Sequence, residues 1–340
     1  MRKHVVGKIK NYLRKLIFSA LNDEAIEGFY QIYYRLMYPK EMQIRKTYGD
    51  LNPDMIFYVI RPRTDCTEGL MSLFMNVTKN IHYAQENGYE PIVDFLNYKT
   101  QYSKENMNQE NAWEYFFTQP SQYSLEEVYH SKNVILSGLE IQWYRPEIYN
   151  VDFSNNMLRK LHFDIFSSIN FSEEVMKNVN LEVHKLQLNY DKTLALYLRG
   201  TDYIKLKPSG HPVQPTVRQA VEIINQYIYK YNIDKIFLVT EDGEIYRTIK
   251  SIYDNRCVIV SFDSFINNYK GEKFLSHDDS IKELSGLPYQ RGLNYLVKLI
   301  ILSKCAYFIG GNTMGSWAAC TFSEKDYVDK YVFDLGVYGK

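Results

Sequence analysis

The sequence has 340 residues, which predicts two domains because one hydrophobic core rarely serves a chain of this length. Lys and Arg together number 40, as do Asp and Glu, so there is no excess positive charge to attract nucleic acid. No stretch reaches the roughly 18 apolar residues that a membrane-spanning helix needs, which disfavours an integral membrane protein.

Residues 1–45 predict a basic, mainly helical segment. Val5, Ile9 and Leu13 follow the helical spacing, and Lys and Arg residues flank them throughout residues 1–18. A helix of this kind can lie on an anionic membrane as a peripheral contact. It can equally dock on the rest of the protein with its basic side in solvent, and both alternatives stay open.

Residues 46–189 predict a first Rossmann-like domain. Strands are expected at 55–62, 89–95 and 134–139, and a helix at 70–87 joins the first two strands into a βαβ unit. Such a unit implies a right-handed crossover and a parallel sheet. A mostly helical region at 147–189 links this domain to the next.

Residues 190–340 predict a second Rossmann-like domain. Strands are expected at 194–198, 235–241, 257–262, 306–311 and 331–336, with helices at 216–231, 292–304 and 314–322. The predicted fold class is therefore α/β, with two Rossmann-like domains whose parallel sheets face a central cleft. In open parallel sheets, ligands bind beyond the carboxyl ends of the strands.

Several common catalytic signatures are absent from the sequence. There is no GxxxxGK[ST], no GxGxxG, no HExxH and no DxD pair, and none of the seven His residues lies at ligand spacing from another. We therefore expect neither a metal site nor a resident cofactor. Four cysteines without a CxxC pair favour a reduced, cytoplasmic protein.

Polar residues follow the predicted strands of the second domain. Arg199 and Asp202 come after the strand at 194–198, and a guanidinium at that position suits a diphosphate. Gly311, Asn312 and Thr313 lie between a later strand and a helix, where backbone N–H groups face an anion. The alternative is that Arg199 and Asp202 form a structural ion pair that caps the sheet.

Three segments resemble the fucosyltransferase superfamily, which includes α1,6-, α1,2- and protein-O-fucosyltransferases and nodulation-factor enzymes. LYLRGTDY (196–203), followed by GHP (210–212), resembles the Arg-x-Thr-Asp and His-Pro motifs of that superfamily. LVTEDGEIYRTIK (238–250) resembles its next strand and acidic loop, and LIILSKCAYFIGGNTMGSWAA (299–319) resembles its late helix, strand and small-polar loop. The segments occur in the order of the family.

This resemblance implies a GT-B fold, a GDP-fucose donor in the C-terminal domain and inversion at the anomeric carbon without a metal ion. By the same resemblance, Arg199 would contact the donor phosphates and neutralise the leaving diphosphate. The predicted donor-binding residues are Arg199, Thr201, Asp202, His211, Asp242, Gly311, Asn312, Thr313 and Ser316.

The sequence also departs from the family pattern at three positions. Tyr197 stands where many members have His, and Gly200 replaces the second Arg of a common Arg-Arg pair. Lys298 occupies a position where some members use Asp to hold guanine. The last change leaves the phosphate site intact but leaves the identity of the donor base open.

An acceptor hydroxyl needs a general base, and the loop RTDCTEGL (63–70) offers two carboxylates. Glu68 precedes Gly69, and this pair resembles a motif of some protein-O-fucosyltransferases in which the Glu is the proposed base. The alternative for Glu68 is an acid that stabilises the N-terminus of the next helix. Asp65 is the second candidate base, with helix capping as its alternative.

Two further features are expected to be structural. His211 precedes Pro212 at a predicted helix start, so a capping role is preferred to catalysis. The aromatic cluster of Trp113, Tyr115, Phe116 and Phe117 is expected in the core rather than as a sugar platform.

The sequence thus predicts an inverting, metal-independent fucosyltransferase that builds a bacterial surface polysaccharide. Frequent Tyr, Asn, Lys and Ile residues are typical of AT-rich bacterial genomes. The expected partners are a nucleotide-sugar donor and a glycan acceptor, and peripheral contact with a membrane through residues 1–18 is one of the two alternatives for that segment. Two alternatives are a GT-B transferase for another nucleotide sugar and a catalytically silent binding protein of the same fold.

Overall fold

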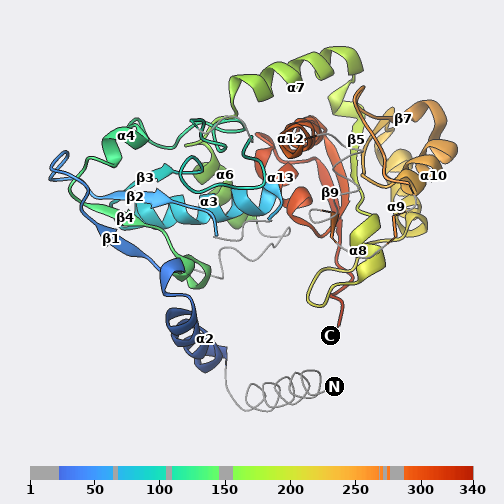
Figure 1. The fold of residues 1–340 in the computed structure, drawn as a ribbon. Helices are drawn as coiled ribbons and strands as arrows, with labels where there is room; N and C mark the ends of the chain where they lie inside the picture. The colour runs from blue at the N-terminus through green and yellow to red at the C-terminus, as the bar shows by residue number, and fades with distance from the viewer. Residues whose placement is uncertain are drawn as a thin grey trace.

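A computed structural model describes residues 23–63, 68–104, 109–144, 156–267, 269–270, 274–275 and 287–339 (Figure 1). The basic segment at residues 1–18 and the candidate base Asp65 lie outside these residues. The described chain forms two separate sheets, one of four strands and one of five. The predicted α/β class with largely parallel sheets is therefore confirmed.

The first sheet has the order β1-β4-β2-β3. Its central strands β2 (Phe57–Ile60) and β4 (Val134–Leu136) are parallel, as are β2 and β3 (Glu90–Val93). Strand β1 (Ile44–Lys46) pairs with β4 in the antiparallel direction, so the expectation of an all-parallel sheet is wrong at this edge. A three-residue strand with two charged residues has no apolar run from which to predict it.

The second sheet is fully parallel, with the order β7-β6-β5-β8-β9. Its strands are β5 (Thr193–Tyr197), β6 (Lys235–Val239), β7 (Cys257–Val258), β8 (Tyr307–Gly311) and β9 (Asp329–Phe333). This is the 3-2-1-4-5 half of a doubly wound fold, whose direction reverses between β5 and β8. The predicted strands are found, several with ends moved by a few residues.

The helices that cover the second sheet begin at recognisable signals. Thr216 and Gln219 form a capping box at the start of α9 (Val217–Tyr231), and Asp242 caps α10 (Gly243–Tyr253). Helix α12 (Pro288–Lys304) begins with proline in its first turn. Thr313 caps α13 (Met314–Phe322), as the small-polar loop before it predicts.

The two sheets share one hydrophobic core. Phe74 of α3 (Leu70–Glu86) packs against Trp317 and Phe322 of α13, with ring centroids 6.0 Å and 5.4 Å away. Figure 1 shows α3 and α13 meeting between the sheets, and α6 (Asn156–Phe166) also packs on α13. This contact fixes the carboxyl ends of the strands in both halves relative to each other.

The predicted aromatic cluster belongs to that core. Trp113, Phe116 and Phe117 are almost completely buried, and the Trp113 indole nitrogen donates to the carbonyl of Thr118 at 2.9 Å. The preference for a core role over a sugar platform is therefore confirmed.

Three further helices lie outside the contact between α3 and α13. Helix α7 (Glu173–Leu186) packs along α12, and the short α4 (Leu125–Val128) precedes β4. Helix α2 (Asp23–Met37) projects from the first half, where it meets the 3-10 turns Pro39–Glu41 and Leu139–Trp143 (Figure 1). None of the described helices combines the length and hydropathy needed to cross a bilayer.

Candidate active site

The carboxyl ends of β5 and β6 bring Arg199 next to two carboxylates. Because the strands pair in register up to Tyr197 and Val239, the residues that follow them emerge side by side. The Nη2 atom of Arg199 donates to Asp202 Oδ1 at 2.9 Å, and its Nε lies 3.7 Å from Glu241 Oε1. The ion pair that formed the structural alternative therefore exists.

Arg199 is nevertheless placed to meet a ligand. Its side chain keeps 23% of its surface exposed and lines a cavity, and the guanidinium lies 4.5 Å from the centre of the Tyr203 ring. Burial alone would lower the pKa of Arg199, but the charges of Glu241 and Asp202 raise that pKa well above its ordinary value. The guanidinium is thus permanently charged and held in one orientation.

The cavity that Arg199 lines has a volume of about 490 Å³. It lies beyond the carboxyl ends of β5 and β6, between α12 and the loop at 262–266, and Gln101 and Tyr102 reach it from the first half. Ligand pockets typically have volumes of about 300–1,000 Å³. The cavity is therefore large enough for a nucleotide and is lined from both halves of the chain.

A second ion pair lies in the same cavity. The Nζ atom of Lys298 donates to Asp263 Oδ1 at 2.8 Å, and the two side chains are only 15% and 1% exposed. Burial raises the pKa of Asp263, and the charge of Lys298 opposes that shift. Sequence reasoning missed Asp263, whose only signal was its position directly after the apolar run that ends at Phe262.

Two tyrosines connect this cavity to the start of α13. The hydroxyl groups of Tyr197 and Tyr295 lie 3.0 Å apart, and burial raises the pKa of Tyr197 to about 12. Both hydroxyl groups pack against the α-carbon of Gly315, where a methyl group would collide with them. The first turn of α13 therefore lies directly beside the cavity wall.

The side chains of this turn that were predicted to bind the donor make hydrogen bonds within the turn. Thr313 Oγ1 accepts from the backbone N–H of Ser316 at 3.2 Å, and Ser316 Oγ donates to the carbonyl of Gly311 at 2.5 Å. The carbonyl of Asn312 accepts from Gln214 at 3.4 Å. These four predicted residues lie next to the switch point between β5 and β8, but they are not among the residues that line the 490 Å³ cavity.

Asp242 and Thr201 similarly form the framework behind Arg199. The Asp242 carboxylate accepts from the N–H groups of Glu244 and Ile245 as the cap of α10, and from the Thr201 N–H at 3.1 Å. A side chain at Gly200 would collide with that carboxylate. This contact explains why the second Arg of the family motif cannot occur here.

His211 lies apart from the cavity. Its Nδ1 is 3.4 Å from the Tyr203 hydroxyl, and its ring packs against Phe274. The backbone carbonyl of His211 accepts from the Tyr338 N–H at 2.9 Å, which ties the GHP segment to the C-terminal residues. The expected capping role of His211 is wrong, because the next helix, α9, begins only at Val217 and has Thr216 as its cap. Donor binding by His211 stays a prediction.

Glu68 lies just before α3 and contacts Arg63 and Gln101. Its Oε1 is 3.8 Å from Arg63 Nε, and its Oε2 is buried without a hydrogen-bond partner among the described residues. The side-chain amide of Gln101, which lines the large cavity, donates to the Glu68 backbone carbonyl at 2.6 Å. A carboxylate with one free oxygen at this position suits a general base, a role that stays a prediction.

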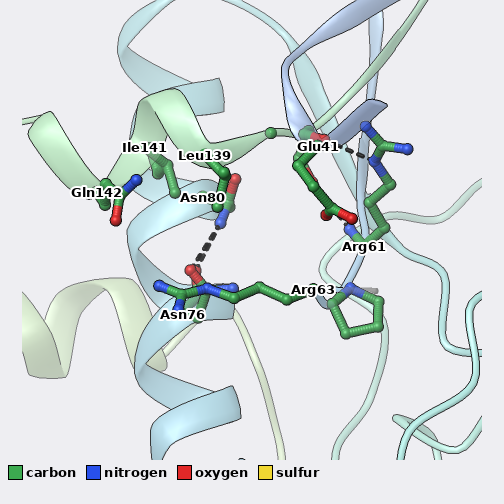
Figure 2. A pocket seen from close by; sticks show the side chains of 11 residues that line it. Glu41, Arg61, Arg63, Asn76, Asn80, Leu139, Ile141 and Gln142 are labelled. Carbon is green, nitrogen blue, oxygen red and sulfur yellow. Dashed lines mark hydrogen bonds between the residues drawn. The ribbon is translucent and has the colours of Figure 1, made fainter. Parts of the chain in front are cut away.

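A smaller cavity of about 30 Å³ lies at the carboxyl ends of β2 and β4 (Figure 2). Arg61 forms one wall, where Nε donates to the Ser137 carbonyl at 2.7 Å and Nη2 donates to the Met42 carbonyl at 3.0 Å. Arg63, the ion-pair partner of Glu68, also lines it. No sequence motif indicated this cavity.

In the part of the chain that the structure describes, no group of three or more His, Cys, Asp or Glu residues is arranged to hold a metal ion. Of the four cysteines, Cys257 and Cys305 are buried free thiols, Cys320 is also buried, and Cys66 lies outside the described residues. Burial raises the pKa of the Cys257 thiol to about 11, so it is protonated at neutral pH.

No protein-family model matches this sequence, and no curated relative does. Solved structures similar to the chain include NodZ fucosyltransferase from Bradyrhizobium, at 15% identity and a TM-score of 0.46 over 84% of this chain and 97% of NodZ. Another is an Arabidopsis thaliana FUT1 mutant in complex with GDP, at 9% identity and a TM-score of 0.46 over 90% and 74% of the two chains. POFUT1 in complex with GDP-fucose matches at 10% identity and a TM-score of 0.34 over 83% and 75%. NodZ is a fucosyltransferase, and the sequence motifs resemble the superfamily of that name.

Proposed function

We propose that this chain is a GT-B glycosyltransferase that transfers fucose from GDP-fucose to a glycan acceptor, with inversion and without a metal ion. In this proposal, residues 46–189 form the acceptor-side domain and residues 190–340 form the donor domain. The observation that carries the proposal is Arg199, a permanently charged guanidinium that lines a cavity at the carboxyl end of a parallel sheet.

Arg199 suits the stabilisation of a leaving diphosphate. As the bond between the anomeric carbon and the β-phosphate oxygen breaks, negative charge grows on the diphosphate, and a fixed guanidinium stabilises that charge. Helix α13 follows the neighbouring strand β8, and its N-terminus lies behind Tyr197 of the cavity wall. In the proposal, the positive end of this helix adds to the favourable field at the diphosphate. Neither group needs to move during the reaction.

The acceptor hydroxyl attacks the opposite face of the anomeric carbon. In our proposal its proton passes to Glu68, whose Oε2 has no hydrogen-bond partner among the described residues. The contact between Gln101 and Glu68 supports this assignment, because it joins the candidate base to a residue of the donor cavity.

Asp263 supports guanine as the donor base. Lys298 stands where some members of the resembled family have Asp, but it pairs with Asp263 in the same cavity. A carboxylate accepts hydrogen bonds from the ring N–H and the amino group of guanine, which adenine does not present in the same arrangement. In this proposal, the Asp263 carboxylate takes the role that an Asp at position 298 has in some members of the resembled family.

A cytoplasmic protein that touches the inner face of a bacterial membrane fits a role in surface polysaccharide synthesis. Helix α2, which follows the basic segment at 1–18, exposes large apolar side chains, namely Phe29, Ile32, Tyr33, Leu36 and Met37. Exposed apolar and aromatic side chains next to a basic segment are typical of helices at membrane surfaces.

A transfer assay with purified protein, GDP-fucose and a panel of glycans tests the proposal. GDP release that depends on GDP-fucose supports it, and a fucosylated product establishes it. If UDP- or ADP-sugars are the only donors turned over, the alternative of another nucleotide sugar replaces it. A catalytically silent binding protein would bind nucleotide but release none from the donor.

A further inference from the structure

The small cavity at the carboxyl ends of β2 and β4 has the lining of a binding site. It lies at the switch point of the first sheet, where β2 has β3 on one side and β4 on the other. We infer that this cavity binds the carboxylate of an acidic sugar unit, such as a uronic acid, in the acceptor glycan. The inference rests on the proposed function, because it names the class of acceptor.

Hydrogen-bond donors dominate the walls of this cavity. Figure 2 shows the Arg63 side chain extending towards Asn76 of α3. Arg63 is 49% exposed, and its 3.8 Å contact with Glu68 is longer than a hydrogen bond. Gln142 Nε2 is buried without a partner among the described residues. A buried amide without a partner is costly, and an oxygen ligand between Gln142 and Arg63 would remove that cost.

The charges around the cavity favour an anion on the Arg63 side. The guanidinium of Arg61 is fixed by backbone carbonyls, so its charge meets no opposite charge in those contacts. Burial lowers the pKa of Lys79, and the positive charge of Arg63 lowers it further, so these two positive charges repel each other. An oxyanion bound to Arg63 would make a charge-assisted contact and weaken this repulsion.

One carboxylate, Glu41, also lines the cavity. In Figure 2 it lies beside Arg61, on the side away from Gln142. A carboxylate there accepts a hydrogen bond from a hydroxyl group. A sugar acid offers both complementary groups, a carboxylate for Arg63 and Gln142 and a hydroxyl for Glu41, whereas a fully deprotonated anion such as sulfate offers only acceptor oxygens.

The size of the cavity limits what enters it. A volume of about 30 Å³ holds one small group but no sugar ring. The ring must therefore lie across the opening, towards Glu68, which contacts Arg63 of this cavity and Gln101 of the donor cavity. This arrangement would place another hydroxyl of the same acidic sugar near the candidate base.

Direct binding measurements test the inference without relying on transfer. The full-length protein is titrated with methyl glucuronide and with methyl glucoside, without donor, by isothermal calorimetry or ligand-observed NMR. We expect the uronide to bind roughly 10- to 100-fold more tightly than the neutral glycoside, as a charge-assisted contact implies. We also expect that preference to weaken as salt is added.

Variants identify the residues involved. Gln142→Glu places a negative charge in the cavity with little change of shape and should abolish the preference, as should Arg63→Gln. The matched control is Arg218→Gln, which removes an arginine that is 90% exposed on α9 and should leave binding unchanged. Melting temperatures of all variants, and GDP binding by Gln142→Glu, show that the fold and the donor site persist.

Each outcome is decisive for one of the two proposals. Equal binding of the two glycosides, no saturable binding of the uronide, or a preference that survives in Gln142→Glu overturns the acidic-acceptor inference. Failure of the wild-type protein to bind any nucleotide diphosphate overturns the proposed function instead. The uronide titration contains no donor, so its result does not depend on nucleotide binding.

Discussion

The side-chain amide of Gln101 donates a hydrogen bond of 2.6 Å to the backbone carbonyl of Glu68. Gln101 lines the 490 Å³ cavity, and Glu68 lies 3.8 Å from Arg63 of the smaller cavity. This single contact therefore connects the two cavities through the residue proposed as the base. The proposed chemistry depends on Glu68 staying in that position.

Replacing Glu68 with Gln separates catalysis from capping. If Glu68 is the base, Glu68→Gln should lower kcat by roughly 10²–10⁴-fold and leave donor affinity unchanged. In the alternative role, Glu68, which directly precedes the N-cap residue Gly69, stabilises the N-terminus of α3 through the helix dipole and takes no part in the reaction. Measurements of kcat, GDP affinity and melting temperature on this variant decide between the roles: a small stability loss with nearly normal kcat would contradict the base assignment.

A buried carboxylate outside the site makes stability depend on pH. Glu182 of α7 accepts from Lys185 at 2.6 Å and from the backbone N–H of Ser261 at 2.8 Å, just before the loop that lines the 490 Å³ cavity. Burial alone would raise the pKa of Glu182, but the hydrogen bonds from Lys185 and Ser261 outweigh burial and lower it.

A lowered pKa means that Glu182 stabilises the fold above its ordinary pKa of about 4.3 and loses this effect as the pH falls below that value. We expect Glu182→Gln to reduce the free energy of unfolding by about 1–3 kcal/mol at pH 7. Urea titrations should show that the difference in unfolding free energy between Glu182→Gln and the wild type becomes smaller as the pH is lowered to 3. The control Glu222→Gln, on a side chain that is 60% exposed, should show almost no difference at either pH.

Chelation tests the metal-independent reaction. In the proposed function, Arg199 supplies the fixed positive charge for the leaving group, so we expect fucose transfer to persist at an undiminished rate in excess EDTA. The assay compares initial rates with EDTA, with added Mg²⁺ and with added Mn²⁺. A rate that vanishes with EDTA and returns with either cation would show that the reaction requires a metal.

Deleting residues 1–18 tests the membrane contact. Each Lys or Arg near an anionic surface contributes about 1 kcal/mol to binding, so the deletion should strongly reduce co-sedimentation with phosphatidylserine liposomes. Turnover of a small soluble acceptor should stay almost unchanged. Liposome binding that survives the deletion, or that salt does not weaken, would favour a basic segment docked on the protein.

The sequence predicts the second sheet well for a physical reason. Parallel strands that are buried on both faces are continuous apolar runs, and each of the five runs coincides with a strand. The predicted ends are less accurate, because the apolar run 257–262 continues past the two-residue strand β7 into the loop of the cavity. Apolar residues indicate that a segment is buried but not that it is a strand. Val260, in the loop after β7, is buried without being part of a strand.

The site was predictable only where chemistry is local in sequence. Arg199 follows a strand, and that position alone places it at the sheet edge. The pairing of Asp263 with Lys298 joins residues on two separate elements, and the link from Gln101 to Glu68 joins two loops, so neither follows from spacing. Thr313 and Ser316 show the converse, because residues typical of anion binding also cap helices, and their hydrogen bonds here are internal.

The most direct test of the central claim is the effect of Arg199 on GDP binding, measured by melting temperature and calorimetry. A ligand that binds only the folded state raises its melting temperature. GDP should raise that of the wild-type protein more than UDP or ADP does, and Arg199→Lys, which keeps the charge but not the fork, should weaken GDP binding roughly 10-fold or more. The exposed control Arg218→Lys should bind GDP as the wild type does. GDP affinity that is equal in wild type and Arg199→Lys, or no response to any nucleotide diphosphate, would contradict the account.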